Sequence, residues 1–226
     1  MQVLRGHWQL IALIGLVFAL WQTPVTIPLK ILIVFLHELS HAAMTVLTGG
    51  EVVSLTLSAD QGGAVWSIGG NRFLTLTAGY LGSLLIGLVL LIAATRTHAD
   101  RAIMGIFGVL MLVVTALYIR DGFAIIFCVG TGALMLVTAR FLPHDVNDLI
   151  LRVIGLTSMV YVPYDIFSDT IARSDLRSDA RMLAEEFGGA TIMWGGIWLV
   201  ISVAVIGMSL WRGLGPSSNI ALRKTH

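Results

Sequence analysis

Residues 29–44 read LKILIVFLHELSHAAM and place two histidines, His37 and His41, four residues apart in a run whose other members are almost all apolar. A helix brings positions i and i+4 to the same face, so both imidazoles project in one direction. Glu38 directly follows the first histidine. It is close enough to reach a water molecule beside any metal ion that the two rings hold. The segment therefore predicts a helix that carries a candidate metal site.

The order of these residues matches the H-E-x-x-H motif of zinc hydrolases. An i, i+4 pair of neutral imidazoles on a rigid helix fixes two corners of a tetrahedron and leaves room for a third ligand and a water. Zinc lowers the pKa of that water, and a nearby carboxylate can take its proton and pass it to a leaving amine. We therefore predict one Zn2+ per chain, with His37 and His41 as ligands and Glu38 as the general base.

The composition is that of an integral membrane protein. Of the 226 residues, 57% are hydrophobic and 12% are charged, and the mean hydropathy of +0.89 is far above the range of soluble proteins. Ionisable side chains inside apolar segments of membrane length are costly and functional by default, which strengthens the metal-site prediction. The formal charge of +1 leaves no basic surface that would suggest a nucleic-acid partner. The short, loop-poor chain favours the bacterial plasma (inner) membrane.

Apolar segments long enough to cross a bilayer recur along the whole chain. The predicted spans are residues 8–23, 29–48, 73–95, 102–119, 122–138, 149–167 and 190–210. The first is separated from the motif helix by two prolines and could instead be a shallow or re-entrant segment. We expect an all-α polytopic membrane protein of about six or seven transmembrane helices, forming a single integral membrane domain over residues 1–226 with a polar tail at 213–226.

The segment after the motif helix has a β pattern. Val53, Leu55 and Leu57 alternate with polar residues, residues 60–63 have turn composition, and residues 64–68 resume β-type side chains. This predicts one short interfacial β-hairpin, because the segment is too short and polar to cross the membrane. An unpaired strand edge there could receive an extended peptide. An ordinary connecting hairpin explains the pattern equally well.

The next predicted span contains the run AGYLGS at residues 78–83. Small residues on one side of a membrane helix let the backbone of another helix approach closely. The motif helix is the natural partner for this contact.

A zinc site needs a third protein ligand, and a carboxylate is the typical choice beside two histidines. Asp165 is favoured because it follows Pro163 in an apolar span, where the proline is expected to open the helix and a metal ion would neutralise the acid. Asp169 shares its helical face and could instead orient a ligand. The other candidates are Asp121, His98 and His144. The charged segment 171–187 is predicted to be a solvated loop and a short amphipathic helix that needs no functional explanation.

Together, the motif of His37, Glu38 and His41, the hairpin after it, the AGYLGS run and the late Pro-x-Asp span resemble the site-2 protease family of intramembrane zinc metallopeptidases, particularly its compact bacterial and plant branch. The resemblance covers about residues 29–170, the expected metallopeptidase core. It implies that the motif histidines and an aspartate of a later broken helix bind zinc, which assigns the third position to Asp165. The family's aspartate is usually followed by glycine, whereas Asp165 precedes an isoleucine, and the sequence Asp-Gly occurs here at Asp121.

The sequence therefore predicts an intramembrane zinc metalloendopeptidase that hydrolyses a peptide bond in or near a transmembrane segment, with a membrane-protein or peptide substrate and the lipid bilayer as partners. One alternative is a non-catalytic membrane scaffold or pseudoprotease, which would not need an intact His37, Glu38 and His41. A second is an ion-binding transporter that uses Asp165 and Asp169, but the sequence lacks the internal repeat typical of that class. A third is a zinc hydrolase of lipids or small molecules.

Overall fold

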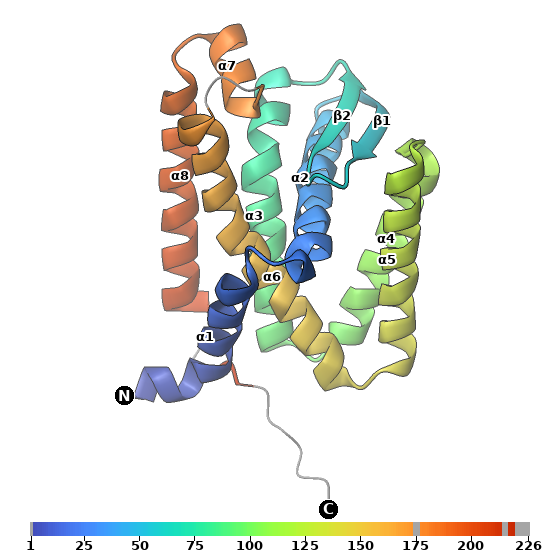
Figure 1. Cartoon of the computed structure of the whole chain (residues 1–226), viewed down its shortest axis with the longest axis vertical. Helices are drawn as coiled ribbons and strands as arrows, with labels where there is room; N and C mark the ends of the chain where they lie inside the picture. Colours follow the sequence, from blue (N-terminus) through green and yellow to red (C-terminus); the bar gives the residue numbers. More distant parts are fainter. Residues whose placement is uncertain (1, 174–176, 214–216, 220–226) are drawn as a thin grey trace, which may run out of the picture.

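The computed structural model describes residues 2–173, 177–213 and 217–219. Over these residues the chain forms eight α-helices and one two-stranded sheet (Figure 1). The elements are α1 (Gln2–Leu20), α2 (Ile27–Leu47), β1 (Glu51–Leu57), β2 (Gly63–Ile68), α3 (Arg72–Arg96), α4 (Asp100–Tyr118), α5 (Gly122–Phe141), α6 (His144–Phe167), α7 (Asp179–Phe187) and α8 (Thr191–Met208). The predicted fold class, an all-α membrane protein with one β-hairpin, is confirmed.

Six helical segments in the described part of the chain are long and apolar enough to cross a membrane. They are Pro24–Leu47, Arg72–Arg96, Asp100–Tyr118, Gly122–Phe141, His144–Ala172 and Thr191–Trp211. The first apolar segment forms a shorter helix, Arg5–Leu20, and the turn Pro24–Thr26 separates it from α2. The motif helix is thus distinct from the first apolar segment, as predicted.

The motif helix α2 lies at the centre of the bundle. Its residues Ile33, Phe35 and Leu36 have almost no exposed surface, and it packs against α3, α6 and both strands. The helix ends at Leu47, and Gly49 follows with a φ of +85°, a backbone conformation that glycine adopts without strain. The chain can therefore turn directly into β1.

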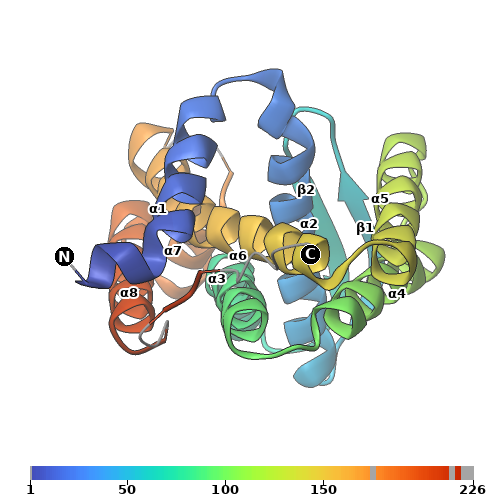
Figure 2. The ribbon, with the colours of Figure 1, turned by 90° about the horizontal axis from the view of Figure 1, so that it is seen from below.

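The hairpin is antiparallel and lies between α2 and the α4–α5 pair (Figure 2). Leu55 and Leu57 are buried, as the alternating pattern predicts, but Val53 is exposed and Val52 is buried in its place. The reason is an irregularity in the strand register between Val52 and Ser54, which turns the preceding side chain to the other face. The inward face thus remains apolar along the strand.

Small residues bring α3 close to two neighbouring helices. A methyl group at Gly82 would lie 2.6 Å from the side chain of Ser40 on α2, which confirms the predicted contact with the motif helix. Farther along α3, a methyl group at Gly155 of α6 would lie 2.6 Å from the carbonyl oxygen of Gly87. At this crossing the Ser158 hydroxyl donates to the carbonyl of Ser83 at 2.8 Å. Close backbone packing therefore holds α2, α3 and α6 together.

The structure corrects two expectations about α6. The helix begins at His144 rather than at residue 149, and it continues through Pro163 to Phe167 instead of opening at the proline. The π-helical turn Ser168–Ala172 follows directly. Proline removes one backbone donor but has a φ compatible with a helix, so packing against α3 and α2 keeps the segment helical.

Part of the predicted polar tail is described. The backbone N–H of Ser218 donates to the carbonyl oxygen of Gly6 at 2.9 Å, and the side-chain amide of Asn219 donates to the carbonyl oxygen of Arg5 at 2.8 Å. The segment 217–219 therefore lies against the start of α1. Residues 214–216 and 220–226 of the tail fall outside the described residues.

Gly155→Ala should lower the unfolding temperature in detergent, because its added methyl group meets backbone atoms of α3 that cannot move separately. Overpacking of this kind typically costs about 1–3 kcal/mol. The matched control is Gly130→Ala on α5, where no atom lies within 4 Å of the added methyl group. Equal unfolding temperatures for the two variants would contradict the proposed close crossing of α3 and α6.

Candidate metal centre

The two motif histidines lie one turn apart on α2 with their rings turned toward each other. Their Nε2 atoms are 3.0 Å apart, and the ring centroids are 4.7 Å apart at an interplanar angle of 78°. His41 is buried and His37 is partly exposed to the cavity described below. The predicted i, i+4 geometry is therefore present, with both nitrogens free to face a common point.

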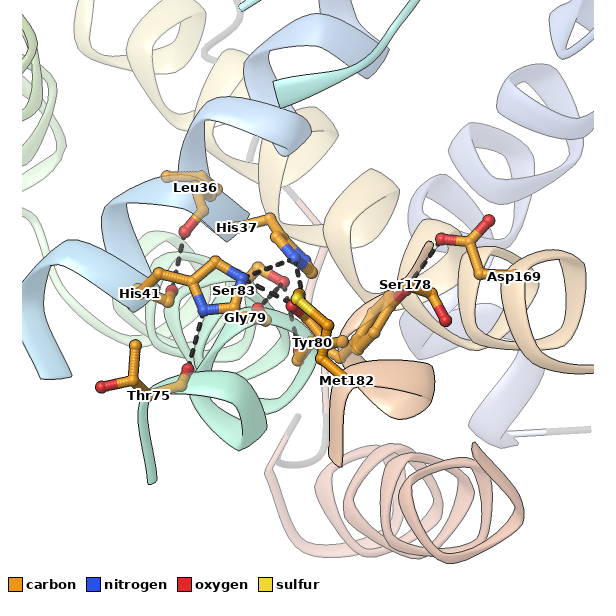
Figure 3. Close-up of polar contacts among 12 residues, drawn as sticks. Leu36, His37, His41, Thr75, Gly79, Tyr80, Ser83, Asp169, Ser178 and Met182 are labelled. Carbon is orange, nitrogen blue, oxygen red and sulfur yellow. Dashed lines mark hydrogen bonds and ion pairs between the residues drawn. The ribbon is translucent and has the colours of Figure 1, made fainter. Parts of the chain in front are cut away.

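The third donor comes from Asp179, the first residue of α7. Its Oδ2 atom lies 3.0 Å from Nε2 of His37 and 3.2 Å from Nε2 of His41. In the described part of the chain, these three side chains form the group of histidine, cysteine, aspartate and glutamate residues whose ligand atoms are close enough to hold a metal ion. Figure 3 shows the two imidazoles facing the start of this helix.

The local sequence explains the position of Asp179. The Ser178 hydroxyl accepts a hydrogen bond from the backbone N–H of Arg181 and caps the helix. Ala180 and Leu183 are completely buried, and α7 packs against α3 and α8. On this amphipathic helix, Asp179 shares the inward face with Leu183, and it is only 8% exposed. The packing of α7 thus directs the carboxylate at α2.

The surroundings of Asp179 favour its ionised form. Burial by itself would raise the pKa of the carboxyl group, but the charge of His41 and hydrogen bonds from His37 and His41 outweigh it and hold the pKa below its ordinary value. The group therefore presents an anionic oxygen to the two imidazoles, as a metal ligand must.

Helix α3 orients the histidines from the other side. Nδ1 of His41 lies 2.7 Å from the carbonyl oxygen of Thr75, so Nδ1 donates its proton to that oxygen and Nε2 is the nitrogen that would bind a metal ion. The ring of Tyr80 meets the ring of His37 edge to face at 4.6 Å, and its hydroxyl donates to Asp169 at 2.8 Å (Figure 3). A methyl group at Gly79 would lie 2.5 Å from both Nε2 atoms. A glycine at position 79 therefore leaves space for the metal centre.

Glu38 is buried between α2 and the hairpin. It is 5% exposed and lines the same cavity as the two histidines. A methyl group at Gly63, the first residue of β2, would lie 2.7 Å from both Cγ and Oε1 of Glu38. The start of β2 therefore lies directly against the carboxylate predicted to be the general base.

The metal centre opens into a cavity of about 970 Å³. Helices α2, α3, α6 and α7 form its walls together with the hairpin turn and residues 63–67 of β2. Trp21 and Gln22, which precede α2 in the sequence, also line the cavity. A space of this size can hold several residues of an extended peptide.

The other predicted ligands are in different environments. Asp165 and Asp169 line the cavity, but Asp169 accepts hydrogen bonds from Tyr80 and, at 2.7 Å, from Arg173. Asp121 caps α5 by accepting from the backbone N–H of Ala124 at 2.8 Å. The ring centroids of His98 and His144 lie 5.6 Å apart at an interplanar angle of 49°, and His144 forms an ion pair with Asp100. The geometry thus brings Asp179, and not Asp165, against the two imidazoles.

The position of Asp179 also corrects the expectation that the charged segment 171–187 is solvated and has no functional role. The predicted amphipathic helix is present as α7, but its first residue is buried at the candidate metal centre instead of being solvated. Asp175, in the same segment, lies outside the described residues. The available signal was an aspartate directly after a capping serine, on the helix face that carries Leu183.

The three donors fit a zinc ion. Two imidazole nitrogens and one carboxylate oxygen form a common ligand set for catalytic zinc, and with bonds of about 2.0–2.1 Å tetrahedral ligands lie about 3.3 Å apart. The separations of 3.0–3.2 Å in this structure are slightly shorter. A small outward movement of the three side chains would therefore accommodate the ion.

A comparison with protein families identifies the chain. The model of the family described as Peptidase M50B-like matches residues 10–209. The chain belongs to this family, a site-2 protease family whose members are zinc metallopeptidases, and the resemblance stated from the motifs is confirmed. Searches of curated proteins and of solved structures gave no match. Membership indicates an intramembrane metallopeptidase, in agreement with the six apolar helices of spanning length.

Replacing single aspartates by alanine should show which of them holds the metal. We expect Asp179→Ala to lose most of the bound zinc after purification, because two histidines alone make a weak site. Asp165→Ala, Asp169→Ala and Asp121→Ala should keep about one zinc per chain. Elemental analysis of the detergent-purified proteins measures this. Zinc loss in Asp165→Ala with retention in Asp179→Ala would restore the assignment made from the sequence.

Gly79→Ala should also lower the zinc content, since its methyl group would displace both Nε2 atoms from the centre. Gly196→Ala on α8 is the matched control, because no atom lies within 4 Å of its added methyl group. Both variants should unfold at temperatures close to that of the wild type, so that a zinc deficit in Gly79→Ala reports on the site. Full zinc occupancy in Gly79→Ala would disprove the close contact.

Proposed function

We propose that this protein is an intramembrane zinc metalloendopeptidase that hydrolyses a peptide bond in or near the transmembrane segment of a membrane protein. His37, His41 and Asp179 would hold the metal, and Glu38 would be the general base. The observation that carries this proposal is the convergence of these three donors beside a buried glutamate, in a chain of the Peptidase M50B-like family. We place the protein in the bacterial plasma membrane.

The metal and the glutamate have separate tasks. When bound, zinc supplies Lewis-acid chemistry that polarises a carbonyl group and lowers the pKa of a water molecule. Glu38 takes the proton of the attacking water at a carboxylate oxygen and passes it to the departing amine nitrogen. Burial of Glu38 against Gly63 keeps bulk water from competing for these protons. Thr75 keeps the imidazole of His41 in position, because its carbonyl oxygen accepts the hydrogen bond from Nδ1 described above.

The hairpin provides a place for an extended substrate. β2 pairs with β1 on one side, and its residues 63–67 line the cavity. A peptide added along the cavity side of β2 would use backbone hydrogen bonds, which suit many sequences. Such pairing also offsets the cost of unwinding a transmembrane helix, whose amides are otherwise bonded internally. The start of β2 beside Glu38 would bring that peptide to the catalytic group.

The rival functions are less well supported. A pseudoprotease would have no use for a buried Glu38 next to a complete ligand set. An ion-binding transporter that used Asp165 and Asp169 would need them available to its cargo, whereas Asp169 is paired with Arg173 and Tyr80. A zinc hydrolase of lipids or small molecules would share the metal chemistry, but the family match favours a peptide substrate.

Glu38→Gln should keep about one zinc per chain and lose cleavage of a single-span peptide by about 100-fold or more, because the amide cannot accept the proton. Zinc content and mass-spectrometric detection of cleavage products measure the two effects separately. Full activity in Glu38→Gln would refute the assigned role, and an inactive wild type with bound zinc would refute the proposed function.

Gly63→Ala should reduce cleavage without loss of zinc, because its methyl group would push against the carboxylate of Glu38. Gly62→Ala is the matched control next to it, where the added methyl group would lie 3.2 Å from the Ser58 hydroxyl and meet no other atom within 4 Å. We expect Gly62→Ala to cleave at a rate close to that of the wild type. Similar rates for both variants would contradict the contact between β2 and the base.

A further inference from the structure

The cavity contains a buried cation that the chemistry described so far does not use. Lys30 of α2 is only 9% exposed, although lysine is rarely buried without a partner. Its Nζ atom lies 4.6 Å from the centre of the Trp21 ring. The structure gives this ammonium group no carboxylate partner among the described residues.

Two other cations that line the cavity are differently arranged. Arg72 pairs with Glu186 on α7, and Arg173 pairs with Asp169. Each of these two is thus neutralised by a neighbouring carboxylate of the chain. Lys30 instead has an aromatic neighbour. The face of an aromatic ring attracts a cation but carries no net charge, so the positive charge of Lys30 is not neutralised.

Aromatic rings fix the position of this neighbour. Trp21 contacts Tyr161 at 5.6 Å and Tyr164 at 5.7 Å between ring centroids, so two residues of α6 support it. All three rings line the cavity with Lys30. The ammonium group therefore lies against aromatic side chains of the cavity wall that are packed on one another.

Lys30 lies on the helix face that carries the catalytic group. Lys30, Val34, His37, Glu38 and His41 all line the cavity, and their spacing is that of one α-helical face. Seven to eight residues of helix separate Lys30 from His37 and Glu38, which is about 11 Å along the axis. An extended peptide covers this distance in about three residues.

We propose that Lys30 is a specificity-determining residue that binds a substrate carboxylate about three residues from the scissile bond. The inference rests on the proposed function, because the cavity must receive a peptide. The carboxylate is either an aspartate or glutamate side chain or the free carboxyl end of the substrate chain. A substrate with a neutral group at this point would leave the ammonium unpaired in the closed complex, which costs binding free energy.

The test uses single-span peptides in detergent micelles with the purified full chain. One set carries a single glutamate at successive positions, and a second set carries glutamine there. We expect the cleaved bond to move with the glutamate, at a distance of about three residues, and the glutamine set to be cleaved with a kcat/KM lower by at least about tenfold. A preference for glutamate that persists when the carboxyl end of the peptides is amidated assigns the acidic side chain. Equal cleavage of the two sets that falls when that end is amidated assigns the chain-terminal carboxylate.

Variants connect this preference to Lys30. Lys30→Met should cleave both sets with equal kcat/KM, Lys30→Arg should keep the preference, and Lys30→Glu should favour peptides with lysine at that position. The matched control is Gln22→Met, which removes a polar group from the cavity wall beside Trp21 in the sequence. An unchanged ratio between glutamate and glutamine peptides in Lys30→Met would overturn the inference.

Binding to Glu38→Gln distinguishes this inference from the proposed function. Fluorescence anisotropy of labelled glutamate and glutamine peptides on Glu38→Gln, and on the double variant Lys30→Met with Glu38→Gln, gives the affinity ratio without catalysis. A ratio that disappears in the double variant supports the role of Lys30 even if the wild type cleaves no peptide, in which case the proposed function alone fails. Equal ratios in both proteins overturn the inference.

Discussion

The contact of Asp179 with His37 and His41 is the interaction on which the arrangement of this protein depends. It joins the centre of a buried membrane helix to a short amphipathic helix that lies outside the spanning segments. Two imidazoles without an anionic partner would be a poor metal site, and a buried carboxylate without them would be costly. The contact satisfies both groups and positions α7 over the cavity.

The remaining elements make this contact possible. Helix α3 passes close to α2, and it has a glycine where a side chain would meet the Nε2 atoms of both histidines and a threonine carbonyl that accepts from Nδ1 of His41. The hairpin brings a second glycine against Glu38 and leaves the cavity side of β2 accessible. Packing and the proposed catalysis and substrate entry thus involve the same few positions, and a change at one of them is expected to affect the others.

Local patterns in the sequence predicted most of these elements but not their meeting point. The spacing of His37 and His41, the β pattern and the small residues of 78–83 each report on a single helix or strand, and the structure contains those elements close to the predicted bounds. The third donor depends on a contact between segments about 140 residues apart, which no local pattern encodes. Pro163 and the apolar surroundings of Asp165 favoured that residue, whereas the packing of Ala180 and Leu183 selects Asp179. Val53 was misplaced for a related reason, because a strand irregularity is not visible in an alternating pattern.

The most direct test of the metal centre is the absorption spectrum of the cobalt-substituted protein with cysteine at position 179. A thiolate bound to Co2+ gives a sulfur-to-metal charge-transfer band that a distant thiol does not give, and the buried Cys128 is present in every variant as an internal control. If Asp179 is a ligand, Asp179→Cys gains this band while Asp165→Cys and the wild type do not. A band in Asp165→Cys and none in Asp179→Cys would contradict the centre described above.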